Sequence, residues 1–123
     1  MKILDEVERL RFDPDVAYGP DEPLLDQVTI APLTAPLRTG VPVQAALLRV
    51  APGGRIARHL ATVPQILAVL DGAGEVSGAD GELQAIAAGE AVFWEAGEAH
   101  ETRSDDGLTA LVIEGPGLEP IRR

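Results

Sequence analysis

From Gln27 onward the chain is a succession of short apolar runs cut by turn-forming residues, and this feature restricts its fold more than any other. An Asp-Gly pair, as at 71–72 and 106–107, supplies the positive φ that tight hairpins require. No window of ten or more residues in 41–114 keeps helical periodicity free of Gly or Pro. The pattern predicts an all-β antiparallel sandwich or barrel. The expected strand segments are VTIAPLT (28–34), VQAALLRV (43–50), QILAVL (65–70), GEVSG (74–78), LQAIAAG (83–89), AVFW (91–94), ETRS (101–104) and LTALVIEG (108–115).

The N-terminal region differs from this pattern. Ile3, Val7 and Leu10 have helical spacing, which predicts a short helix within residues 1–11 that Pro14 and Pro20 prevent from continuing. We therefore expect residues 1–25 to form a short arm, residues 26–117 to form the barrel, and residues 118–123 to form a tail.

Two of the expected strands are apolar at every position. The segments ILAVL (66–70) and TALVI (109–113) do not alternate, so both faces of each strand should be covered. Either the N-terminal arm lies outside the sheet, or the outer face meets a second subunit. A homodimer is therefore an expected assembly.

Charge and composition exclude several classes of partner. The chain has 20 acidic and 10 basic residues and a formal charge of -10, and its basic residues form no stripe. This balance argues against nucleic acid, anionic membranes and anionic substrates, and favours a neutral or cationic ligand or a bound metal. The absence of cysteine excludes disulfides, thiolate nucleophiles and Cys-type zinc sites.

The length and the N-terminus also limit the possibilities. A chain of 123 residues holds one core and leaves no room for a separate nucleotide-cofactor domain. Its first residues have acidic side chains where a signal peptide needs an apolar core, and no apolar run is long enough to span a membrane. The expected compartment is the cytoplasm.

The first histidine lies in a spaced set of small and polar residues. His59 is six positions after Gly53, Ala61 is two positions after His59, and Gln65 is four positions after Ala61. Gly72 then follows seven residues later. A histidine beside a turn can simply be an exposed or core side chain, so the spacing gains its weight from a second set.

The second histidine lies in a similar set. Gly89 is followed by Glu95 six residues later, by Gly97 two later, by His100 three later and by Ser104 four later. In both sets and in their separation the chain resembles the cupin family, over residues 53–104. The resemblance implies a double-stranded β-helix, or jelly-roll, barrel.

The resemblance also implies a metal site, in which family members hold a divalent ion with three histidines and a glutamate. Here Ala61 and Gln65 stand at two of those four positions, which leaves His59, Gln65 and His100 as the expected ligands. Two imidazoles and a neutral amide should hold Fe, Mn, Ni, Zn or Cu weakly, because both the charge and the number of ligands are reduced. Gln65 can also be a buried amide that satisfies a strand end.

Four further residues are candidates for a ligand pocket: Trp94, Thr102, Ser104 and Arg58. If His100 points inward, strand alternation places Thr102 and Ser104 on the same face, although each can instead bond only to backbone. Trp94 can equally be core packing. Arg58 is next to His59 and could orient an anionic group, or it could be solvated or ion-paired.

Two functions follow from these residues. The first is a small-molecule-binding cupin with a degenerate metal site at the barrel mouth. The alternative is a metal-dependent cupin enzyme, an oxygenase, isomerase or lyase acting on a small organic substrate. Whether the protein is an enzyme is left open, because cupins support many unrelated chemistries.

Overall fold

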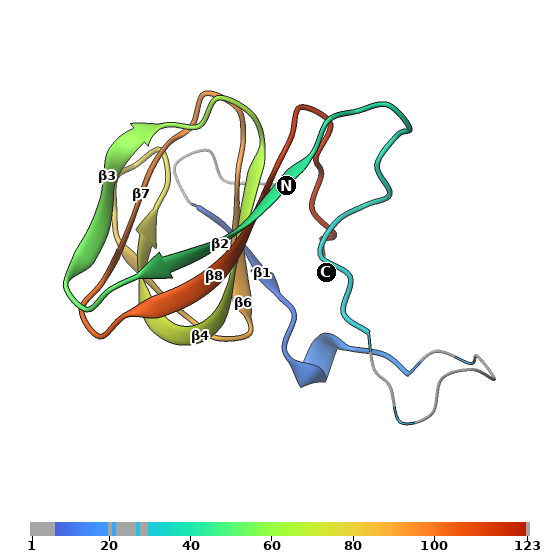
Figure 1. Cartoon of the computed structure of the whole chain (residues 1–123), viewed down its shortest axis with the longest axis horizontal. Coiled ribbons are helices and arrows are strands. Elements are labelled where there is room, and N and C mark those ends of the chain that lie inside the picture. Colours follow the sequence, from blue (N-terminus) through green and yellow to red (C-terminus); the bar gives the residue numbers. More distant parts are fainter. Residues whose placement is uncertain (1–6, 20, 22–26, 28–29, 123) are drawn as a thin grey trace.

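The computed structural model is an all-β barrel, with connecting segments packed against one side (Figure 1). It describes residues 7–19, 21, 27 and 30–122. The elements are β1 (Glu8–Arg11), the 3-10 helix η1 (Pro14–Val16), β2 (Gln44–Val50), β3 (Gly54–Leu60), β4 (Gln65–Ser77), β5 (Gln84–Ala87), β6 (Glu90–Trp94), β7 (Ala99–Ser104) and β8 (Leu108–Glu114). The described residues contain no helix that could span a membrane.

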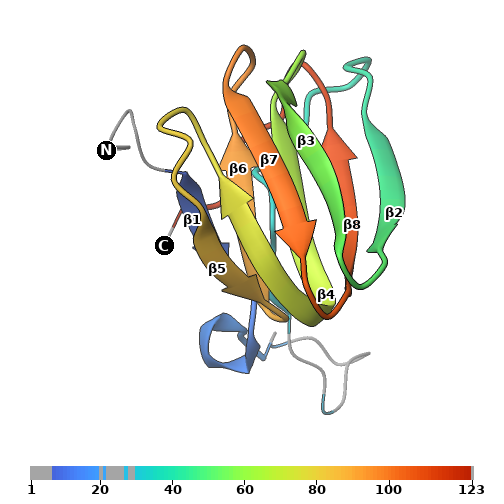
Figure 2. The same cartoon turned by 90° about the vertical axis from the view of Figure 1, so that its left-hand side faces the viewer.

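The long strand β4 belongs to two sheets. Its first part pairs with β6 and β8, and its last part pairs with β5 and β7. One sheet therefore has the order β1-β6-β4-β8-β2, and the other has the order β5-β4-β7-β3. Figure 2 shows the second sheet facing the viewer, with β2, β8 and β6 behind it.

A bulge in β4 separates its two halves. The register with β8 shifts between Val69 and Asp71, and Gly72 has a φ of 80°. A Cβ at Gly72 would collide with the carbonyl oxygen of Gly107. Only glycine therefore fits at position 72. The prediction that Asp71-Gly72 forms a turn between two strands is wrong, because the positive φ bends one continuous strand instead of ending it.

The interior of the barrel holds one apolar cluster. Its buried members are Val7, Val50, Ala61, Leu67, Val69, Val76, Ile86, Val92, Trp94, Leu108 and Ala110. Since β4 alternates, Leu67 and Val69 point into this cluster while Ile66 and Ala68 point to the opposite face.

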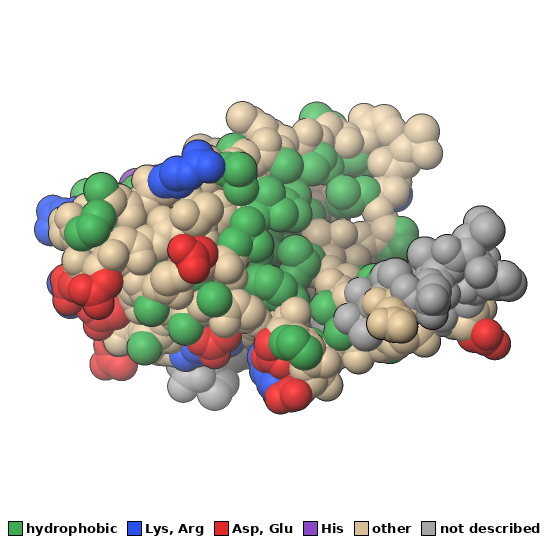
Figure 3. Space-filling model, turned by 60° about the horizontal axis from the view of Figure 1, so that its bottom comes forward, with side chains coloured by type: hydrophobic (Ala, Val, Ile, Leu, Met, Phe, Trp, Pro, Cys, Tyr) green, Lys and Arg blue, Asp and Glu red, His purple; other side chains and the backbone are tan. Residues whose placement is uncertain are grey.

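A second apolar cluster covers the outer face. Leu10 and Leu118 are buried there with Ile66, Ala68 and Phe93. Figure 3 shows hydrophobic side chains gathered between the barrel and the segments packed beside it. The chain's own ends thus cover the outer face of residues 66–68, which accounts for the lack of alternation there. The predicted arm and tail supply part of that cover.

The N-terminal helix is a wrong prediction over residues 8–11, where the chain forms β1 and pairs with β6. Pairing sends Leu10 into the outer cluster, and this burial outweighs the weak helical spacing. The remaining helical positions at 1–6 lie outside the described residues.

Two further strand predictions need correction. Residues 30–34 form no strand; Ile30 and Thr34 each make one isolated bridge. Conversely, β3 was not expected, because GRIARHL has no apolar run. Its place in the sheet comes from pairing with β7.

We expect Gly72→Ala to lower the free energy of unfolding by about 2–4 kcal/mol, because the methyl group adds a backbone collision to the strain of a positive φ. Gly97→Ala is the matched control, since Gly97 has a φ of 83° and open space around its Cα. It should cost only about 1–2 kcal/mol. Urea unfolding of both variants measures the difference, and equal losses would show that the contact with Gly107 carries no energy.

Candidate functional site

A pocket of about 200 Å³ opens on the inner side of β2 and β3. These two strands pair with β8 and β7 respectively and not with each other, so the barrel wall is open between them. The aliphatic part of the lining is Ala46, Leu47, Leu48, Ile56, Leu67 and Val112. The remaining lining residues are His59, Gln65, Trp94, His100 and Thr102. The pocket is therefore mainly apolar, with a few polar groups.

A bulge in β3 places His59 in this pocket. Ile56 is opposite Thr102 and His59 is opposite His100, so three steps along β3 match two along β7. Without the extra residue, Ile56 and His59 would point to opposite faces. With it, both line the pocket, and the rings of His59 and His100 lie 4.3 Å apart between centroids, tilted by 50°.

His100 is the middle ring of three. Its other neighbour is Trp94, at 4.3 Å between centroids and 39° between planes. Trp94 is fully buried and its indole Nε1 donates to the carbonyl oxygen of Ser77 at 3.0 Å. His59, at the other end of the stack, is exposed.

The two histidines differ in their hydrogen bonds. His59 Nδ1 lies 2.8 Å from the carbonyl oxygen of Ala57. Because a carbonyl only accepts, Nδ1 carries a proton, and Nε2 has a lone pair in the uncharged form of the ring. His100 is 5% exposed, and neither of its ring nitrogens has a hydrogen-bond partner among the described residues.

Burial lowers the pKa of His100 from 6.5 to about 4. The charges of His59 and Arg58 act in the same direction, and Glu98 opposes them. At neutral pH His100 is therefore an uncharged imidazole, with one donor and one acceptor.

The other predicted pocket residues fall into two groups. Thr102 and Trp94 line the pocket. Ser104 does not: its hydroxyl donates to the carbonyl of Ala73 at 2.6 Å and accepts from the backbone of Gly107 at 2.8 Å. Arg58 is also outside the lining.

The guanidinium of Arg58 binds the turn that follows β4. It donates to the carbonyl oxygens of Gly78 and Ala79 at 3.0 and 2.8 Å. The bulge that brings His59 inward is the reason that its neighbour points away.

Comparison with known proteins agrees with this geometry. Residues 46–114 match the family model of the cupin domain. The chain belongs to the cupin family. No curated protein matches it significantly.

Solved structures show the same fold. An RmlC-like cupin from Shewanella frigidimarina has a TM-score of 0.57 and 19% identity, over 60% of this chain and 66% of that one. A predicted oxalate decarboxylase from Thermotoga maritima has a TM-score of 0.52 and 25% identity, over 56% and 62%. The polyketide cyclase RemF from Streptomyces resistomycificus has a TM-score of 0.56 and 24% identity, over 66% and 59%. This cupin thus has the double-stranded β-helix fold, and it spans just under two thirds of the first of these relatives.

The donor set of this cupin does not fit a resident divalent metal. Ala61 belongs to the interior apolar cluster, and Gln65 supplies a neutral amide. No group of three or more His, Cys, Asp or Glu side chains within the described ranges could hold a metal ion. The two imidazoles also contact each other as rings. Two imidazoles and one amide supply no negative charge and fewer protein ligands than the family's three histidines and glutamate, so they bind a divalent ion weakly.

Sequence reasoning missed the aliphatic wall of the pocket. Leu67 follows Gln65 by two residues and could have been found by alternation. Ile56 could not, because the bulge hides its relation to His59. β2 supplies part of the pocket lining because the barrel is open between β2 and β3. No sequence pattern within β2 indicates this opening.

Lowering the pH should destabilise the fold through His100. Its pKa is about 4 when folded and near 6.5 when unfolded, so the unfolded chain binds the extra proton first. Above pH 6.5 the protonation of His100 does not lower the free energy of unfolding. As the pH drops from 6.5 to 4, the free energy of unfolding should fall by about 3 kcal/mol. Urea unfolding of wild type and His100→Gln across this range measures it.

The fluorescence of Trp94, the chain's one tryptophan, gives an independent reading of the same proton, because an imidazolium in ring contact quenches indole emission. A quenching midpoint near pH 6.5 in the folded wild type would contradict the buried, neutral His100.

Adding Mn²⁺, Ni²⁺ or Zn²⁺ should leave the thermal midpoint of the wild type nearly unchanged. Gln65→Glu should give a metal-dependent rise, because it adds a carboxylate to the two imidazoles. Differential scanning fluorimetry with a chelator control measures both proteins. Stoichiometric metal in wild type purified without chelators, lost in His59→Ala/His100→Ala, would contradict the donor-set argument and support the metal-enzyme alternative.

Proposed function

We propose that this cupin captures a small, largely apolar organic molecule, uncharged or cationic, in the pocket between β2 and β3, without a resident metal. The observation that carries this proposal is the lining itself, in which aliphatic side chains surround His59, Gln65, His100 and Thr102. A mainly apolar pocket with a few convergent polar groups is the usual form of a small-molecule site.

Size and charge restrict the ligand. The volume of about 200 Å³ is below the roughly 300–1,000 Å³ typical of sites for drug-sized molecules. Among the described residues, the lining includes no Lys, Arg, Asp or Glu. An anion would find no counterion there and would be repelled by the chain's charge of -10.

The polar groups define what the ligand must offer. His59 Nε2 can accept a hydrogen bond, and the Gln65 amide can donate or accept. One hydroxyl or amine on the ligand would satisfy His59, and a carbonyl would suit Gln65. His100 lies one ring deeper, and a group that reaches it would relieve part of the roughly 1–3 kcal/mol that an unpaired buried polar group costs.

Binding can be followed by the fluorescence of Trp94. Cyclohexanol, cyclohexanone and cyclohexylamine are suitable probes, with cyclohexanecarboxylate as the anionic counterpart of the same shape. The proposal expects saturable changes with the first three and none with the carboxylate. Stronger binding of the carboxylate would overturn the assignment of ligand charge.

Ala46→Leu should weaken probe binding by roughly tenfold or more, because the added side chain occupies part of the pocket. Ala45→Leu is the matched control: Ala45 is the preceding residue on β2, is also exposed, and is outside the described lining. Equal affinities of the two variants would place the probe elsewhere.

A further inference from the structure

A second cavity, of about 490 Å³, lies on the outer side of the barrel. It shares no lining residue with the pocket between β2 and β3. Two of its lining residues, Phe93 and Leu118, belong to the buried outer cluster. The cavity therefore lies where the C-terminal segment, residues 115–122, packs on the outer face of the sheet that contains β6.

Backbone hydrogen bonds fix the segments that form this cavity. Residues 33–35 are joined to residues 119–121 by two such bonds of 3.0 Å each, and Gly115 donates to the carbonyl oxygen of Pro64 at 3.1 Å. Three of the lining residues are prolines, whose φ angle is restricted by the ring. Because these walls are already ordered, a ligand that enters the cavity loses little affinity to ordering of the protein.

The lining combines a buried apolar floor with exposed charged side chains. Phe93, Leu118 and Pro120 are buried. The exposed charged residues of the lining are Arg38, Glu95, Glu119 and Arg122. A ligand can therefore place hydrocarbon on the floor while its polar groups meet the charges around it.

One of these four charges already has a counterion. Arg122 Nε and Nη2 lie 2.7 and 3.1 Å from the two carboxylate oxygens of Glu8. Its guanidinium also lies 5.9 Å from the centre of the Phe93 ring, in a cation–π contact. Arg122 is thus held in place as part of the wall.

The other three charges are available to a ligand. Within the described part of the chain, the side chains of Arg38, Glu95 and Glu119 form no hydrogen bond or ion pair. Opposite charges therefore line one cavity without pairing with each other. A guanidinium offers a carboxylate two parallel donors, and carboxylates accept the hydrogen bonds of an ammonium group.

We propose that this cavity binds a small zwitterion, in which a carboxylate and an ammonium group are joined by a hydrocarbon chain. The carboxylate pairs with Arg38, the ammonium group pairs with Glu95 and Glu119, and the chain lies on the apolar floor. The net charge of -10 supports the same ligand class, because it repels a free anion, whereas the ammonium group of a zwitterion offsets that repulsion. The site is independent of the function proposed for the barrel pocket.

Isothermal titration calorimetry with 6-aminohexanoate tests this site. Hexanoate and hexylamine have the same chain and each lack one of the two charges. The zwitterion should bind saturably, and each of the other two should bind roughly tenfold more weakly or worse. Since hexylamine also suits the barrel pocket, the titrations are repeated with Ala46→Leu, which should leave the affinity for 6-aminohexanoate unchanged.

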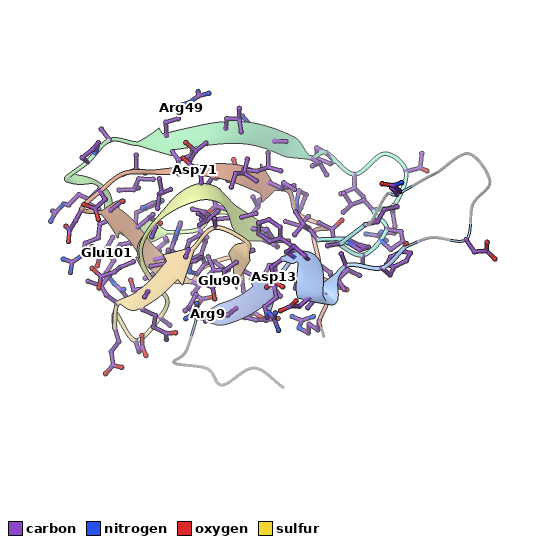
Figure 4. The ribbon with its side chains drawn as sticks, turned by 90° about the horizontal axis from the view of Figure 1, so that it is seen from below. Arg9, Asp13, Arg49, Asp71, Glu90 and Glu101 are labelled. Atoms are coloured by element: carbon purple, nitrogen blue, oxygen red, sulfur yellow. The ribbon has the colours of Figure 1, made fainter. Side chains whose placement is uncertain are left out.

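Charge-removing variants assign the two ends of the ligand. Arg38→Gln should lower the affinity for 6-aminohexanoate to that for hexylamine, and Glu95→Gln/Glu119→Gln should lower it to that for hexanoate. Arg49→Gln and Glu101→Gln are the controls of the same chemistry, because both residues are outside the lining and lie on the barrel, away from the connecting segments (Figure 4). Both controls should leave the affinity unchanged.

Several results would overturn this site. They are the absence of saturable heat with 6-aminohexanoate, binding of hexanoate or hexylamine as tight as that of the zwitterion, and equal weakening by Arg38→Gln and Arg49→Gln. Loss of 6-aminohexanoate binding in Ala46→Leu would also overturn it, because the zwitterion would then occupy the barrel pocket. Cyclohexanol binding, followed through Trp94 in the same samples, keeps the two proposals apart: its persistence would leave the proposed function standing.

Discussion

The whole molecule depends on the bend within β4. A single strand can serve two sheets only if it changes direction, and the bulge at 69–71 with Gly72 at a φ of 80° provides that change. Gly107 approaches so closely that no side chain fits at Gly72. Because β4 bends, the two sheets that share it face each other and form a barrel. Gln65 belongs to one of these sheets, and the two histidines belong to the other.

A second irregularity, the bulge in β3, places His59 in the pocket. The extra residue turns His59 inward and Arg58 outward. His59 then covers His100, which rests on Trp94. The result is a column of rings that ends in an exposed imidazole beside aliphatic side chains. At the buried end of this column the charged form of the imidazole is disfavoured, so His100 is neutral at neutral pH.

Much of this could be predicted from the sequence. The runs of apolar residues indicated most of the strands, and the spacing around the two histidines indicated the family and brought Gln65 to attention. Trp94 was named as a pocket candidate because it is near the second histidine set in the sequence, and Thr102 because it shares a strand face with His100. The all-β fold and the family could be predicted because strand period and motif spacing are local features of the sequence.

The remainder depends on contacts between distant residues. Asp71-Gly72 has the same local chemistry in a bulge as in a hairpin, and only its partner strands decide between them. β3 has little apolar character of its own, and the bulge that orients Arg58 leaves no mark in the sequence. Ser104 satisfies alternation, but its hydroxyl is taken by the backbone of two other segments.

The ladder between β2 and β8 carries one more consequence, for motion. β2 forms a wall of the pocket, yet among the described strands it pairs with β8 alone. Elements with few neighbours open locally at lower free energy than the core. Detachment of β2 would open the pocket along its length while the ring column and the β4 bend stayed in place. Under the proposed function, the lifetime of a bound molecule would then depend on the opening rate of this one strand.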